Sequence, residues 1–122
     1  MGFDGADGLA ARCAAAKRAH QAFAARIELA RADAHMWLAG ALARADLQYL
    51  PDADVCAARV RAHAVDDLVA ALALRHGAPP AVVRAHVRRL LCPGVWEACG
   101  DAHVRCALED GDLVVHVRAG AQ

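Results

Sequence analysis

The stretch C-P-G-V-W-E-A-C-G-D-A-H-V-R-C, residues 92–106, contains side chains that could bind a metal ion. Cys92, Cys99, His103 and Cys106 would form a set of three thiolates and one imidazole, which zinc accepts. The spacing lacks the two cysteines separated by two residues that most structural zinc sites have, and His103 and Cys106 would point to opposite faces of a strand. We therefore predict a turn leading into a hairpin, and a metal site at these four residues is the less favoured alternative.

The chain contains no Ser, Thr or Asn, and this excludes several kinds of catalytic and modification site. A serine or threonine nucleophile, a phosphate-binding loop ending in Gly-Lys-Ser/Thr, and N-glycosylation are all impossible. The paired acids Asp66–Asp67 and Glu109–Asp110 occur where a helix N-terminus and a turn favour acidic residues. We therefore expect a protein that is not an enzyme and that binds no cofactor.

Length and composition predict a single cytoplasmic domain. At 122 residues the chain fits one domain, and its richness in Ala, Arg, Gly and Val suggests a GC-rich bacterial genome. Its first residues, M-G-F-D-G-A-D-G, lack the basic start and apolar run of a signal peptide, and no apolar run is long enough to span a membrane. In that compartment the five cysteines are expected to be mainly free thiols.

Residues 7–50 contain no proline and one interior glycine, Gly40. Apolar and small side chains recur at spacings of three and four residues, which is typical of one face of a helix. We predict one long helix over residues 7–50, with a break near Asp33 or Gly40 as the alternative. The predicted stripe consists of Leu9, Cys13, Ala16, His20, Phe23, Ile27, Ala30 and Ala34, and continues through Leu38, Leu42, Ala45 and Tyr49.

A helix of that length would extend beyond a compact body. About 42 residues rising ~1.5 Å each span roughly 60 Å, whereas a compact domain of this size has a radius of gyration of about 14 Å. The rest of the chain cannot cover the whole stripe, so either the helix bends into a hairpin or another chain buries part of it. The lack of turn residues between 9 and 49 favours the second. The predicted interface residues are Phe23, Ile27, Ala30, Ala34, Trp37 and Leu38.

Two further segments complete the predicted fold, which is mainly α with a β-hairpin (α+β). Residues 54–91 are predicted to be helical, with one helix over 54–76, a stop at the G-A-P-P sequence of residues 77–80, and another helix over 80–91. As an alternative, Asp66 or Asp67 would cap a new helix and split the segment 54–76 in two. Apolar residues alternate in H-V-R-C-A-L and L-V-V-H-V-R, on either side of E-D-G-D, so residues 102–118 are predicted to form a β-hairpin.

Residues 68–91 resemble a bacterial helix-turn-helix, with Ala73 in the first helix, Gly77 at the turn and Val83 in the second helix. The hairpin that follows would resemble the wing of a winged helix-turn-helix regulator. The resemblance implies that residues 80–91 are a recognition helix and that duplex DNA is a possible partner. The DNA-contacting residues would be Arg84, Arg88 and Arg89, and residues 55–92 carry a net charge of +4.

Taken together, these patterns favour a non-enzymatic accessory, adaptor or chaperone-like protein. It would act by helix-mediated association with a protein partner or with itself, as a homo-oligomer. A DNA-binding regulator is the first alternative, and a small Cys/His metal-binding protein is the second.

Overall fold

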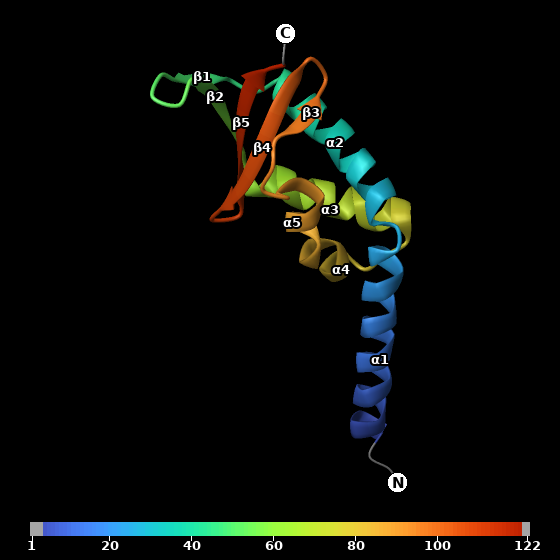
Figure 1. Ribbon diagram of the computed structural model, residues 1–122. Helices are drawn as coiled ribbons and strands as arrows, with labels where there is room; N and C mark the ends of the chain where they lie inside the picture. Colours follow the sequence, from blue (N-terminus) through green and yellow to red (C-terminus); the bar gives the residue numbers. More distant parts are fainter. Residues whose placement is uncertain (1–3, 121–122) are drawn as a thin grey trace.

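The computed structural model describes the backbone of residues 4–120 and the side chains of residues 8–120 (Figure 1). The helices in this part of the chain are α1 (Asp4–Ala24), α2 (Ile27–Ala43), α3 (Ala62–His76), α4 (Pro80–Ala85) and α5 (Val87–Leu91). The strands are β1 (Gln48–Leu50), β2 (Val55–Val60), β3 (Glu97–Cys99), β4 (Ala102–Glu109) and β5 (Asp112–Ala119). The fold is therefore mixed α+β.

The strands form one antiparallel sheet in the order β1-β2-β5-β4-β3. Strands β4 and β5 are paired along their whole length, from Ala102 opposite Ala119 to Glu109 opposite Asp112. The turn residues Asp110 and Gly111 both have positive φ, 53° and 84°, which matches the twist of a two-residue hairpin. The predicted hairpin over residues 102–118 is confirmed.

Only one face of the sheet is covered by helices. Alternate residues of the three central strands are buried against α2, α3 and α5, and the residues in between point to the opposite, open face (Figure 1). The core therefore lies between the sheet and the helices. Its strand residues are Ala58, Val60, Val104, Cys106, Leu113 and Val115.

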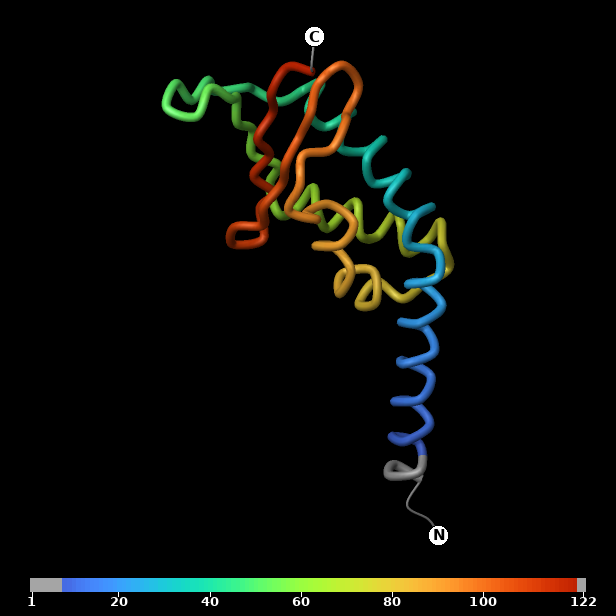
Figure 2. The backbone as a smooth tube through the Cα atoms, in the orientation of Figure 1, coloured from blue at the N-terminus to red at the C-terminus, as the bar shows by residue number. Residues whose placement is uncertain are grey.

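The prediction of one helix over residues 7–50 is wrong, because the chain bends at Ala25 and Arg26 and the second helix ends at Ala43. At the bend the Arg26 amide donates to the Phe23 carbonyl at 2.9 Å, three residues back instead of four. The bend lets α2 lie across the body while α1 points away from it (Figure 2). Residues 48–50 form an edge strand instead of a last helical turn.

The prediction of continuous helix over residues 54–76 is also wrong, because residues 55–60 form strand β2 and pair with β5. Val60 is buried in the core, and helix α3 begins only at Ala62. The predicted helix over 80–91 divides at His86, whose ring turns inward so that Nδ1 lies 2.9 Å from the Val82 carbonyl oxygen. The predicted stop after His76 is present, with Gly77 in the left-handed conformation.

Asp112 joins the hairpin to the start of α3. Its carboxylate accepts a 2.7 Å hydrogen bond from the Ala62 amide and a 3.0 Å hydrogen bond from Arg59. The bond from Arg59, followed by the bond from Ala62, holds the pKa of the Asp112 carboxyl below its usual value. This capping stability is therefore present above the pKa of an unfolded aspartate and is lost as the pH falls through the folded-state pKa.

We expect Asp112→Asn to be less stable than the unchanged protein at pH 7, because it removes the charge that both donors contact. The difference should shrink as the pH falls and the wild-type carboxyl becomes protonated. Urea unfolding at pH 7 and at pH 3 measures it. Asp110→Asn is the matched control, since it makes the same charge change two residues away. Equal losses in the two variants would contradict the capping role.

Candidate association surface

Helix α1 projects from the body for more than half of its length (Figure 1). Every residue from 9 to 18 is exposed. Its predicted stripe starts with Leu9, Cys13 and Ala16, all of which are exposed, and first contacts the body at His20 and Phe23. We call these exposed residues, 9–18, outer α1. Within the described part of the chain, outer α1 has no surface to pack on.

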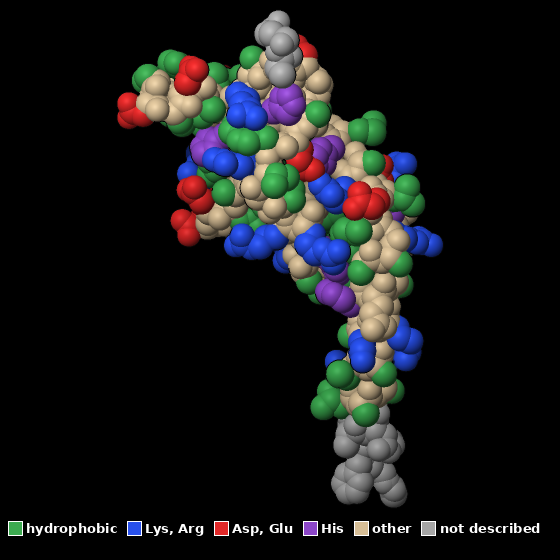
Figure 3. All heavy atoms as spheres, viewed as in Figure 1, with side chains coloured by type: hydrophobic (Ala, Val, Ile, Leu, Met, Phe, Trp, Pro, Cys, Tyr) green, Lys and Arg blue, Asp and Glu red, His purple; other side chains and the backbone are tan. Residues whose placement is uncertain are grey.

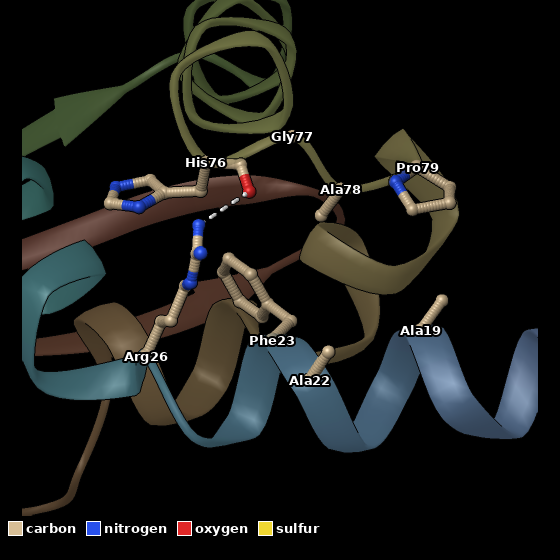
Figure 4. A pocket seen from close by; sticks show the side chains of 8 residues that line it. All are labelled: Ala19, Ala22, Phe23, Arg26, His76, Gly77, Ala78 and Pro79. Carbon is tan, nitrogen blue, oxygen red and sulfur yellow. Dashed lines mark hydrogen bonds between the residues drawn. The ribbon is translucent and has the colours of Figure 1, made fainter.

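The C-terminal end of α1 and the bend, residues 19–26, form the root of α1. A hollow of about 190 Å³ lies between this root and the turn between α3 and α4 (Figure 4). Phe23 points into this turn and is only 2% exposed. Arg26 reaches across from the end of the helix, and its guanidinium donates to the His76 carbonyl oxygen at 3.3 Å. The residues that line the hollow are Ala19, Ala22, Phe23, Arg26, His76, Gly77, Ala78 and Pro79.

Aromatic contacts hold this root against the body. The ring of His20 lies 4.2 Å from the ring of His86, and the ring of Phe23 meets His86 edge-on at 5.2 Å. His76 is fixed in turn by a 2.8 Å contact from Nε2 to the Asp33 carboxylate of α2. The direction in which α1 leaves the body is thus determined by packing against α3 and α4, as well as by the bend.

Helix α2 carries a second row of apolar and small residues on the side facing away from the core. Leu29 is 66% exposed and Met36 is 75% exposed. These residues, with three alanines, recur at helical spacing along the helix. We call this row the outer α2 stripe: Leu29, Ala32, Met36, Ala39 and Ala43.

The predicted interface residues lie in the protein's own core, so that prediction is wrong in its residues. Phe23, Ala30, Ala34 and Leu38 are buried, and Ile27 and Trp37 pack against them. The bend at Ala25 and Arg26 causes the difference, because it turns this part of the stripe onto α3 and α5. The exposed residues lie to either side, on outer α1 and on the outer α2 stripe.

The exposed part of α1 and the β1–β2 segment differ in charge. Residues 8–27 contain Arg12, Lys17, Arg18 and Arg26 and no acid, although Asp4 and Asp7 precede them in α1. Residues 46–54, which lead into and join β1 and β2, contain three exposed acids and no Lys or Arg: Asp46, Asp52 and Asp54. In Figure 3 acidic side chains mark the projecting β1–β2 loop, while basic side chains are visible on the α1 end.

The structure does not bring the four predicted metal ligands together. Cys106 is buried on the core face of β4, whereas His103 lies on the open face, as the strand alternation predicts. Burial raises the pKa of the Cys106 thiol to about 12, with nearby Cys92 adding to the rise, so this group stays protonated at neutral pH. Among the residues described, no group of three or more His, Cys, Asp or Glu side chains is placed to hold a metal ion.

The three predicted DNA-contacting arginines lie on the exposed side of α4 and α5. Arg84 is paired with Asp66 of α3 at 2.8 Å, which leaves Arg88 and Arg89 as the unpaired members among the described residues. The strand before α3, β2, pairs with β5 of the hairpin. The broken helix at His86 and the acidic hairpin tip are poorly suited to reading a duplex groove.

Comparison with known proteins identifies no relative: no family model, curated protein or solved structure matches the chain. None of the helices that the structure describes is both long and apolar enough to cross a membrane.

Proposed function

We propose that this protein is a non-enzymatic adaptor that associates through its helices with a second copy of itself. In the proposed homodimer, outer α1 of each protomer packs on the outer α2 stripe of the other. The observation that carries the proposal is the continuous exposure of residues 9–18 on a helix that leaves the body. An isolated helical segment of this length is only marginally stable in water, so a packing partner would stabilise it.

Side-chain size and helix length suit this pairing. Alanine predominates on both surfaces, and small side chains let two helices approach closely. Helix α1 has 21 residues and α2 has 17, so they span about 31 and 26 Å, respectively. Leu29 and Met36 provide larger side chains for the contact. Because each protomer donates one α1 and one α2 surface, the contact occurs twice and closes as a two-fold dimer.

Charge favours a second copy over an unrelated basic partner. The basic outer part of α1 needs an acidic surface, and the chain's own exposed acidic segment, residues 46–54, lies just beyond the end of α2. An α1 that runs antiparallel along the partner's α2, with its free end towards that segment, would place Arg12 nearest the acids of the second copy. This attraction predicts that high salt weakens the dimer.

The test is native mass spectrometry combined with light scattering of the full chain, for the unchanged protein and two variants. We expect a dimer for the unchanged protein and a monomer for Leu29→Asp with Met36→Asp, because two buried carboxylates would have no partner. Leu74→Asp is the matched control, since Leu74 is 87% exposed on α3, away from the proposed contact. A monomeric unchanged protein, or a dimer that survives the double variant, would contradict the proposal.

A further inference from the structure

The open face of the sheet carries a group of basic and aromatic residues around Trp96. On β4 and β5 the outward positions pair Arg105 with His116 and His103 with Arg118. Trp96 immediately precedes β3, the strand beside β4. We call these five residues the Trp96 cluster. Figure 3 shows Lys/Arg and His side chains gathered over the upper part of the sheet, away from α1.

Two arginines share the indole ring of Trp96. The guanidinium carbon of Arg118 lies 4.3 Å from the ring centre, and that of Arg105 lies 5.1 Å from it. Stacking on an indole fixes the plane of a guanidinium while leaving its N–H groups free to donate. The two side chains are therefore held in position on the face of the sheet.

The cluster has no opposing acid among the described residues. Neither Arg105 nor Arg118 takes part in an ion pair or a side-chain hydrogen bond within residues 8–120. Glu109 and Asp112, two acids on the same face, lie at the far end of the hairpin and contact Arg59 there. Asp101, in the turn before β4, forms no ion pair with the cluster among the described residues. Arg105 is four residues from Glu109, or about 13 Å along the strand.

From these observations we infer that the Trp96 cluster binds single-stranded nucleic acid. The arginines would donate to the phosphates, and a base would stack on the exposed plane of a guanidinium. The uncovered face of the sheet supplies a surface on which an extended strand can lie. This site is separate from the α1 and α2 surfaces and does not depend on the proposed dimer.

The shape of the site favours a single strand over a duplex. The stacking groups lie on the open face of the sheet, and a duplex keeps its bases stacked inside, where Trp96 and its arginines cannot reach them. His103 and His116 flank the arginines on the same face and offer ring N–H groups to an acceptor oxygen of the strand.

The first measurement is fluorescence anisotropy of labelled oligo(dT), about 20 nucleotides long, titrated with the full chain. We expect Arg105→Ala with Arg118→Ala to weaken binding at least about tenfold. The slope of log K against log salt concentration should also become less negative, by about 0.7 for each phosphate that the protein no longer neutralises. Arg88→Ala with Arg89→Ala is the matched control, because it removes the same charge from α5. This control variant should bind oligo(dT) with an affinity within about twofold of that of the unchanged protein.

The second measurement uses Trp96 as its own reporter. The chain has two tryptophans, so Trp37→Phe leaves Trp96 as the one emitting indole, and its fluorescence should be quenched on binding. Equal weakening by both arginine pairs would overturn the inference, as would equal affinity for a duplex of the same length. Absence of binding to oligo(dT), with binding to phosphatidylserine vesicles instead, would also overturn it.

Discussion

Replacing Phe23 with alanine is expected to lower the free energy of unfolding by about 3–5 kcal/mol, because it empties the site where α1 joins the body. Phe23 is buried, and its ring contacts His86 at 5.2 Å and His76 at 6.2 Å between centroids. The two histidines belong to different elements, so the cavity would loosen α1 from α3 and α4 together. Urea unfolding followed by circular dichroism measures the loss.

A control variant and a proteolysis assay test whether the loss of stability arises where α1 joins the body. Leu74→Ala removes an apolar side chain that is 87% exposed, so we expect its effect to stay within about 0.5 kcal/mol. Trypsin should cleave Phe23→Ala faster after Arg26, at the bend, because the detached helix opens the backbone there. A loss below about 1 kcal/mol with unchanged cleavage would show that Phe23 does not anchor α1.

The parts of the fold that local sequence specifies were predictable. The hairpin of β4 and β5 has alternating apolar residues and a glycine at a turn position that requires positive φ, and both signals act within a few residues. The end of α3 at Gly77 and the start of α4 at Pro80 follow from the same local chemistry. These features needed no knowledge of distant contacts.

The parts that distant contacts specify were not predictable. The sequence V-C-A-A-R-V of β2 is compatible with a helix, and its partner strand β5 lies more than fifty residues later. The bend at Ala25 and Arg26 has neither glycine nor proline to mark it. It arises because Phe23 packs on α3 and α4 while Ala30 packs on the core, and a straight helix would not place both there. Tertiary burial thus overrides local helix propensity.

The candidate surfaces show the same division. The N-terminal helix extends beyond the body at residues 9–18, as its length predicts. The bend then turns the predicted interface residues into the core, so the exposed surface lies elsewhere on the two helices. For the Trp96 cluster, the alternation in the predicted hairpin places His103 with Arg105, and His116 with Arg118, on one face. The position of Trp96 against the arginines depends on the pairing of β3 with β4, which three residues do not reveal.

Replacing Glu97 with alanine is expected to lower the free energy of unfolding by about 2 kcal/mol, because it leaves a partly buried arginine without its partner. Glu97 joins β3 to α2: it accepts a hydrogen bond from Arg31 and lies 3.2 Å from His35 Nε2. The side chain of Arg31 is 26% exposed, and its Nε is buried with no hydrogen-bond partner in the described chain. Without Glu97, the acid left beside this guanidinium among the described residues would be the exposed Glu28, whose Oε1 lies 3.6 Å from Arg31 Nη1.

An exposed ion pair provides the control that separates the cost of an unpaired arginine from the cost of removing a carboxylate in general. Glu109 pairs with Arg59 at 3.4 Å at the exposed hairpin end, so Glu109→Ala should cost no more than about 0.5 kcal/mol. Combining Glu97→Leu with Arg31→Met removes both charges and should recover most of the stability lost in Glu97→Ala. Urea unfolding of the four proteins provides the comparison. If the double variant is as unstable as Glu97→Ala, the cost lies in packing at β3 instead of in the unpaired arginine.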